Sequence, residues 1–370
     1  MAAVIYTHFH IYSYSLPFTR PIHSMNQILT NRNGLLIQLQ IDAGLSAFGD
    51  VPPFPGLSNE SIDMAVKQLA AAGRKLVGHT VNETKSSHPL ELLAELETIL
   101  APEERLYPGV AFGIESVVLD VLAQAAGVTI AELLARSPHF QVKTNGLIVG
   151  DIKEIPARAQ QLIDSGYTCL KIKVGRGDAA ADIRMLRDMN DLIGPHIKIR
   201  LDANRAWTLK EAVHFARSIA ALNIDYVEEP LQTPELLKDF AETGLAVALD
   251  ESLDEKWLAQ PPEGVVAFVL KPGINGGVLD TIRFIKKAQE HDVRPIISSA
   301  FLNAIGLKMA VMLAAAFTSP DEVMGLDTSS FLAADFCRLP VKIKNGILDV
   351  RELSQNIIIP DKLIDKVYSC

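Results

Sequence analysis

Cysteine is scarce in this sequence, and the few cysteines present show no pairing pattern. The 370 residues include three of them, Cys169, Cys337 and Cys370, an odd number without C-x-x-C spacing. A disulfide framework needs pairs and a thiolate metal site needs closely spaced cysteines, so the sequence argues against both. This usage is typical of a protein in the reducing cytosol, which is the location that we expect.

An excess of positive charge and long apolar runs are also lacking. Lysine and arginine number 35 against 44 aspartate and glutamate, a net charge of −9, so binding to a nucleic-acid backbone is not expected. The apolar run Met309–Phe317 is much shorter than the ~18 residues that a membrane-spanning helix needs. The segment Met1–Phe18 alternates histidine and tyrosine with other residues, which favours a strand over a signal peptide. We therefore expect a cytoplasmic protein with no membrane partner.

Apolar residues are plentiful, at 48% of the chain, and 370 residues exceed the ~250–300 at which single cores stop growing. The first third predicts a mixture of strands and helices. From about residue 141, short β-like runs alternate with helical stretches and no hairpin signal separates them, which predicts parallel strands joined by crossover helices. The expected strands are 142–149, 168–174, 197–202, 226–228, 246–250, 265–271, 294–298 and 322–326.

Charged residues end five of these strands at the same phase. They are separated by 29, 26, 22 and 21 residues, one strand–helix unit per step, and are Lys173, Asp202, Glu228, Asp250 and Lys271. Lys171 lies on the same strand face as Lys173, and Arg200 lies on the same strand face as Asp202. A strand covered on both faces is apolar throughout, whereas a closed barrel gathers polar side chains at the carboxyl ends of its strands. The pattern therefore favours a barrel with an active site at that end.

The residue types indicate the chemistry of this predicted site. Asp202, Glu228 and Asp250 offer only oxygen ligands, which suits a hard cation such as Mg²⁺ better than zinc. A divalent cation also explains how three carboxylates can stay ionised together. Lys173 and Lys271 flank the cation, and we expect its charge to lower their pKa values, so that one can accept a proton near neutral pH. The set suggests removal of a proton next to a carboxylate.

These residues lie in motifs that resemble the enolase superfamily and, within it, the o-succinylbenzoate synthases of the proteobacterial type. The resemblance covers nearly the whole chain, and its most specific motifs are Lys171-Ile172-Lys173, Arg200 to Trp207, Glu228-Glu229-Pro230, Asp250 to Leu253, Lys271-Pro272, Ile297-Ser298-Ser299 and Gly325 to Thr328. It implies an α/β fold, a modified TIM barrel (β/α)7β with an α+β capping domain. The expected division is residues 1–105 for the cap, 106–325 for the barrel, and 326–370 for a segment that returns to the cap.

The resemblance also implies an activity and residue roles. The activity is the Mg²⁺-dependent syn dehydration of 2-succinyl-6-hydroxy-2,4-cyclohexadiene-1-carboxylate to o-succinylbenzoate, a carbon–oxygen lyase step of menaquinone biosynthesis. A small-molecule carboxylate is thus the expected substrate, and no protein partner is implied. Lys173 would be the base, Lys271 would stabilise the enediolate, and Asp202, Glu228 and Asp250 would bind Mg²⁺. Residues expected to bind substrate or orient the ligands are Lys171, Arg200, Asn204, Glu229, Ser298, Ser299 and Gly325.

Two positions depart from the family pattern, and three other readings compete with this one. Leu302 lies where the family often has glutamate, and Asp50 replaces the more usual glutamate after Gly49. An N-acylamino acid racemase or dipeptide epimerase would use the same two lysines. Gly175–Ala180 fits a dinucleotide-binding fingerprint, but two lysines in a strand buried on both faces argue against it. A barrel that only binds ligands would have lost a lysine or a metal ligand, and none is lost.

Overall fold

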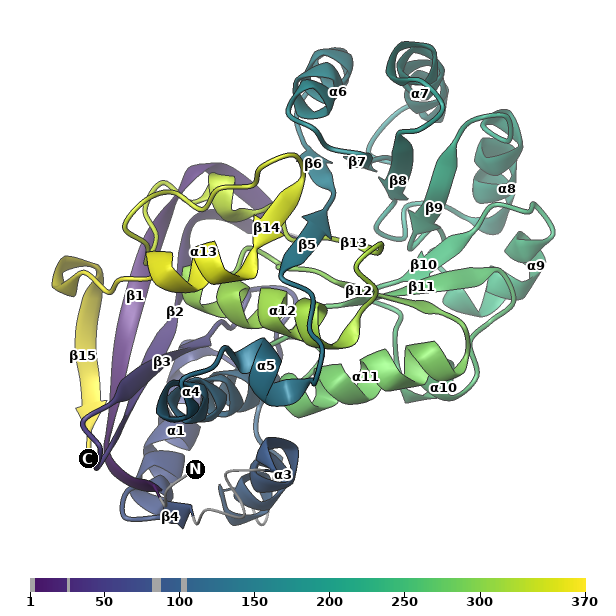
Figure 1. Ribbon diagram of the computed structural model, residues 1–370. Helices are drawn as coiled ribbons and strands as arrows, with labels where there is room; N and C mark the ends of the chain where they lie inside the picture. Colours follow the sequence, from purple (N-terminus) through teal and green to yellow (C-terminus); the bar gives the residue numbers. More distant parts are fainter. Residues whose placement is uncertain (1–3, 25–26, 82–87, 101–104) are drawn as a thin grey trace.

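The computed structural model describes residues 4–24, 27–81, 88–100 and 105–370. Figure 1 shows two regions, an antiparallel sheet with helices and, beside it, a ring of parallel strands surrounded by helices. The cap sheet has the strand order β15-β1-β2-β3, with β4 paired to β1. Its strands are β1 (Val4–Ser24), β2 (Gln27–Ile41), β3 (Ser46–Val51), β4 (Thr80–Val81) and β15 (Ile364–Ser369).

Helices cover the cap sheet on one side and fill the space between it and the barrel. They are α1 (Ile62–Leu76), α3 (Pro89–Leu100), α4 (Pro108–Ala126) and α5 (Ile130–Leu134). Among the described residues, only α4 has the length and apolar composition of a membrane-crossing helix, yet 78% of its most apolar window is buried inside the protein. Glycines let α4 approach β3 closely, because a Cβ at Gly49 would lie 2.2 Å from the carbonyl oxygen of Gly113. These features are typical of a core helix.

The second region is the predicted barrel. Seven parallel strands follow one another in sequence order, and a bridge between Ser298 and Gly325 continues the ring to β13, which pairs with β5. The seven strands are β6 (Gly146–Ile148), β7 (Cys169–Lys173), β8 (Lys198–Asp202), β9 (Ile224–Glu228), β10 (Val247–Leu249), β11 (Val265–Leu270) and β12 (Arg294–Ile297). The two strands that continue the ring are β13 (Val323–Met324) and β5 (Gln141–Thr144). The closed ring confirms the predicted fold class and excludes the open dinucleotide-binding sheet.

The connections carry the helix signals that the alternating pattern predicts. Thr208 and Glu211 form a capping box at the start of α8 (Leu209–Ser218), and Asp178 caps α7 (Ala179–Ile193). The longer helices on the outside of the ring are α6 (Ile155–Asp164), α7 (Ala179–Ile193), α8 (Leu209–Ser218), α11 (Val278–Glu290) and α12 (Ala304–Phe317). Two shorter ones are α9 (Leu237–Ala241) and α10 (Glu255–Ala259).

The first expected strand, 142–149, is interrupted at Asn145. Its amide donates to the carbonyl of Met324, so β5 pairs with β13 and with β14 (Ile347–Asp349), whereas β6 pairs with β7. The segment after the barrel contains β14 (Ile347–Asp349) and α13 (Val350–Asn356) before β15 pairs with β1. The three-part division of the chain stays a prediction.

Candidate active site

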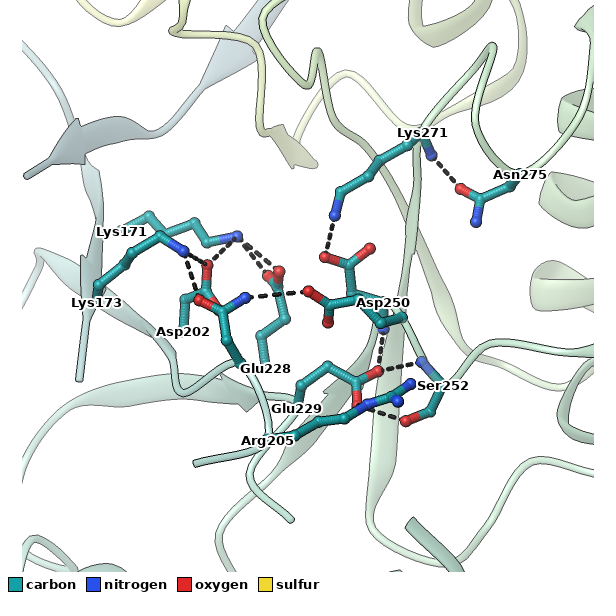
Figure 2. Close-up of polar contacts among 12 residues, drawn as sticks. Lys171, Lys173, Asp202, Arg205, Glu228, Glu229, Asp250, Ser252, Lys271 and Asn275 are labelled. Atoms are coloured by element: carbon teal, nitrogen blue, oxygen red, sulfur yellow. Dashed lines mark hydrogen bonds and ion pairs between the residues drawn. The ribbon is translucent and has the colours of Figure 1, made fainter. Parts of the chain in front are cut away.

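The five strand-end residues lie together at the carboxyl ends of neighbouring barrel strands. Lys173, Asp202 and Glu228 are directly paired across β7, β8 and β9. Asp250 and Lys271 immediately follow β10 and β11. All five line a cavity of about 690 Å³ between the barrel and the cap, and Figure 2 shows Lys171 and Lys173 on one side of the carboxylates with Lys271 on the other. The structure thus brings together the residues that the strand-end pattern selected.

Three carboxylates form the floor of this cavity, and all are buried, with 1–4% of each residue exposed. Lysine ammonium groups pair with them. Lys171 Nζ lies 2.6 Å from Glu228 Oε2 and 3.3 Å from Asp202 Oδ2, while Lys173 Nζ lies 3.4 Å from Asp202 Oδ2. Lys271 donates to Asp250 Oδ2. Burial of so many charges is tolerable only because each ammonium faces a carboxylate.

The two kinds of charge shift one another's titration. Burial raises the pKa of the Asp202 carboxyl, but the three lysines outweigh burial and hold that pKa at about 2. For Glu228 burial prevails and raises the pKa to about 8, and burial likewise raises the pKa of Asp250. For Lys271, the neighbouring carboxylates outweigh burial and raise the pKa. The expected lowering of the Lys271 pKa depends on the charge of a bound divalent cation beside these carboxylates, and it stays a prediction.

The carboxylates fit a hard divalent cation by their chemistry. Among the described residues, no three His, Cys, Asp or Glu side chains already form a metal-binding cluster. Asp202 Oδ1, however, is buried and has no hydrogen-bond partner, which is costly unless a ligand supplies one. An all-oxygen donor set suits Mg²⁺. Two observations therefore support a divalent-cation site here: the all-oxygen donor set and the unpartnered Asp202 oxygen.

Glu229 and Asn204 orient the residues beside them. Both have a left-handed backbone, with φ of 47° and 43°, a conformation that is uncommon for non-glycine residues and costs energy that surrounding contacts must offset. Glu229 Oε1 accepts hydrogen bonds of 2.7 Å from the amides of Asp250 and Ser252, which ties the end of β9 to the end of β10. Asn204 accepts from Lys173 Nζ through its Oδ1 and donates to Glu251 over 3.1 Å. These contacts fix two of the carboxylate-bearing loops and the Lys173 amine.

Arg200 does not join this group. Its guanidinium bonds Asp225 Oδ2 at 2.9 Å, Glu322 Oε1 at 3.1 Å and the carbonyl of Val323 at 2.5 Å. These partners lie at the amino-terminal ends of β9 and β13, and Arg200 itself lies two residues before the end of β8. The structure therefore corrects the expectation that Arg200 orients the Mg²⁺ ligands, because alternate residues on a strand face stand in different layers of the barrel.

Of the remaining predicted residues, some line the cavity and one lies behind its wall. Ser298 and Gly325 line the cavity and bridge to each other. Ser299 is fully buried, and its hydroxyl lies 2.7 Å from that of Thr328, behind the cavity wall. Other lining residues have no periodic signal in the sequence, except Glu251, which follows Asp250 directly. These other lining residues are Ile22, Ser24, Phe54, Leu57, Asn145, Leu147, Arg176, Arg205, Ala300, Phe301, Asp327 and Thr328.

Comparison with known proteins places this geometry in a family. Residues 154–354 match the enolase C-terminal domain-like family, and residues 6–121 match the MenC N-terminal domain. A dipeptide epimerase from Cytophaga hutchinsonii, solved with Mg and D-Ala-L-Val, superposes with a TM-score of 0.82 at 20% identity, over 98% of this chain and 99% of that one. The muconate lactonizing enzyme of Pseudomonas fluorescens gives 0.81 at 21% identity, over 93% and 94%. These two likenesses show the fold.

Similarity in sequence is more specific. The o-succinylbenzoate synthase of Pasteurella multocida is 31% identical over 364 residues, which cover 96% of this chain and 98% of that protein. That of Yersinia pseudotuberculosis serotype O:3 is 31% identical over 333 residues, 89% of this chain and 92% of that protein. The chain belongs to the o-succinylbenzoate synthase family of the enolase superfamily.

Proposed function

We propose that this enzyme dehydrates 2-succinyl-6-hydroxy-2,4-cyclohexadiene-1-carboxylate to o-succinylbenzoate in menaquinone biosynthesis. The ring loses the proton next to its carboxylate and then its hydroxyl group, which together leave as water, and the product is aromatic. The observation that carries the proposal is the pair of amines, Lys173 and Lys271, on opposite sides of three buried carboxylates. Family membership supports the choice of reaction.

Lys173 is proposed as the base. Its amine is held by the Asn204 amide oxygen and faces Asp202, so it stands at a defined place on the cavity wall. Proton transfer by such a positioned group contributes ~10²–10⁴-fold to a rate. The Lys173 amine, once it has taken the proton and become an ammonium, can deliver that proton to the departing hydroxyl on the same ring face. This gives a syn elimination with a single acid–base group.

Asp202, Glu228 and Asp250 are proposed to hold Mg²⁺, with the unpartnered Asp202 oxygen as a ligand. When bound, the cation would supply positive charge for the substrate carboxylate and make the adjacent proton more acidic. Lys171 contacts two of the three carboxylates and keeps them in place. Lys271 adds positive charge from the opposite side, where it stabilises the negative charge that develops as the proton leaves.

A second candidate activity is racemisation or epimerisation of an N-acylamino acid or dipeptide. The facing lysines favour it, because one amine could remove a proton and the other could return it on the opposite face. Dipeptide epimerases share this fold. The two activities differ in what the second lysine must do, since dehydration needs it only as a fixed positive charge.

The test is turnover of the cyclohexadiene substrate by purified enzyme with Mg²⁺, with EDTA, and after Lys173→Ala. We expect metal-dependent product formation that the substitution abolishes. An N-succinyl amino acid in deuterated water tests the second activity, through racemisation and exchange of the α-proton. No dehydration by folded, metal-loaded enzyme contradicts the proposal, and racemisation in that case supports the epimerase activity. Cell fractionation tests the proposed cytoplasmic location.

A further inference from the structure

A buried arginine at the boundary between the cap and the barrel has no role in the chemistry described so far. Arg32 lies on β2 with 2% of its surface exposed. Within the described residues, each hydrogen bond recorded for its guanidinium goes to a backbone carbonyl. A buried charge is costly. The buried Asp50 carboxyl interacts with it electrostatically, but the hydrogen-bond partners are neutral carbonyls, which satisfy its donors without balancing its charge. Such a residue is best explained by what it holds together.

The carbonyls belong to two separate loops as well as to β2 itself. Arg32 Nη2 donates to Pro52 over 2.8 Å and Nη1 to Pro53 over 2.9 Å, in the loop that follows β3 of the cap. Nε donates to Phe301 over 3.1 Å, in the loop that follows β12 of the barrel. A fourth acceptor, the carbonyl of Asn33, lies beside Arg32 on its own strand. One side chain thus fastens a cap loop to a barrel loop.

The same contacts place two aromatic rings on the cavity wall. The guanidinium carbon lies 5.2 Å from the centre of the Phe54 ring. Phe54 stacks on Phe301, with ring centres 5.9 Å apart and an interplanar angle of 16°. Both rings line the cavity with the catalytic lysines. Their surface contributes to the apolar lining of a pocket that also presents carboxylate and ammonium groups.

The barrel loop needs an external hold. Ala300 and Phe301 both have a left-handed backbone, with φ of 42° and 60°. Two consecutive non-glycine residues persist in that region only when surrounding contacts fix them, and the bond from Arg32 Nε to the Phe301 carbonyl is such a contact. The cap loop is fixed at further points, where Ser24 Oγ donates to the Pro55 carbonyl and Ser58 Oγ accepts from the Phe54 amide, each over 2.9 Å.

We propose that Arg32 is a positioning residue that clamps the loop 52–58 to the loop after β12, and that the resulting Phe54–Phe301 stack is a preassembled wall for the non-polar part of the ligand. The assignment of that ligand as o-succinylbenzoate or its precursor rests on the proposed function. The clamp itself does not, because it is defined by contacts within the protein. A ligand then binds without first having to order either loop.

The first test is hydrogen exchange, which requires no activity. In Arg32→Met we expect the amides of Leu57 and Ser58, which donate to the Phe54 carbonyl, to exchange at least tenfold faster than in the unchanged enzyme. Arg283→Met is the matched control, because Arg283 also lies over a phenylalanine, Phe284, but on the outer helix α11. Equal exchange rates at Leu57 and Ser58 in Arg32→Met and the unchanged enzyme overturn the clamp.

The second test separates positioning from general stability. We expect Arg32→Met to raise the Kd of o-succinylbenzoate and the KM of the substrate about tenfold, with kcat changed less than threefold. In a Phe301→Leu background, Arg32→Met should raise the Kd and the KM less than threefold, because the aromatic stack is already lost. Equal costs in both backgrounds overturn the proposal.

If Arg32→Met does not fold, Phe301→Leu alone tests the proposal, since it keeps the backbone carbonyl that Arg32 binds. An unchanged Kd of o-succinylbenzoate in that variant contradicts the proposed role of the Phe54–Phe301 stack in ligand binding. No turnover by the unchanged enzyme counts against the proposed function instead, and exchange at Leu57 and Ser58 still decides the clamp.

Discussion

The barrel interior holds two clusters of charge, and they differ in how completely their polar groups are paired. At the amino-terminal end of the strands lies the basal cluster, which we define as Arg200, Asp225, Arg294 and Glu322. Asp225 accepts from Arg200 over 2.9 Å and from Arg294 over 3.0 Å, and Glu322 accepts from Arg200 over 3.1 Å. Both arginines also lie over the ring of Tyr226. The basal cluster satisfies its own charges.

The site at the other end uses the same kinds of charge but leaves one buried oxygen of Asp202 without a partner. The loops around it also contain five non-glycine residues with a left-handed backbone, namely Asn204, Arg205, Glu229, Ala300 and Phe301. Unpaired groups and strained backbone cost stability and are retained where a ligand or reaction uses them. In this barrel, the charged cluster with complete pairing is structural, whereas the cluster with an unpartnered oxygen is the candidate site.

Removal of the proposed base should have the largest effect. We expect Lys173→Ala to lower kcat by about 10²–10⁴-fold while leaving the fold unchanged, because the substitution removes the amine that Asn204 holds in place. Steady-state dehydration measures the effect. Lys198→Ala is the matched control on the adjacent strand, since Lys198 lies 3.8 Å from Asp225 at the basal end and is half-exposed. If both variants lose activity equally, the contrast between the two ends fails.

Removal of the metal ion should have the second-largest effect on activity. Treatment with EDTA is expected to abolish turnover and Mg²⁺ to restore it, because three buried carboxylates need a cation to bind an anionic substrate. Saturating Mg²⁺ should also stabilise the enzyme by about 2.7 kcal/mol at one hundred times its Kd. Thermal unfolding measures this shift, which Glu228→Gln should reduce and Asp225→Asn should preserve. An equal shift in all three proteins would remove Glu228 from the metal site.

Disruption of the basal cluster should change stability and leave the chemistry intact. Asp225→Asn deprives the buried Arg200 and the adjacent Arg294 of their shared counter-charge, for which we expect a loss of about 3 kcal/mol in the free energy of unfolding. Urea titration measures the loss, and kcat of the folded variant should stay within threefold. A drop in kcat as large as that of Lys173→Ala would show that the basal cluster takes part in catalysis.

The smallest expected effect is on pH dependence. Burial raises the pKa of Asp225, but the two arginines outweigh burial and hold that pKa below its ordinary value. A carboxyl with a depressed folded-state pKa adds stability above its ordinary pKa of 3.8, and that stability disappears as pH falls further. The stability gap between the unchanged enzyme and Asp225→Asn should therefore narrow between pH 5 and pH 3, by on the order of 1 kcal/mol. A constant gap would contradict the assignment.

The sequence predicted the barrel and the main site residues because both depend on periodic features. Strand–helix alternation predicted the ring, and the shared phase of Lys173 and Lys271 with three carboxylates predicted that their side chains meet. Phase alone could not separate Arg200 from Asp202, since both face inward and only their height in the barrel differs. That height depends on strand register, which is set by pairing across the sheet.

Other parts of the site could not be predicted, because they depend on contacts between distant segments. Arg32 and Phe301 lie 269 residues apart and meet only when the cap sits on the barrel. The left-handed backbone of Phe301 has no signature in the sequence, since such a conformation is ordinarily that of glycine. The break at Asn145 likewise depends on the carbonyl of Met324.

The pairing of β15 with β1 has a consequence for the order in which the molecule assembles. Tyr14 pairs with Ile364, 350 residues further along the chain, and the whole barrel lies between them in sequence. A contact of such long range forms late, because closing the chain over that distance is entropically costly unless the intervening residues are already compact. The edge strand β15 can therefore be added to the cap sheet only after the barrel has folded, so the two ends of the chain are joined last.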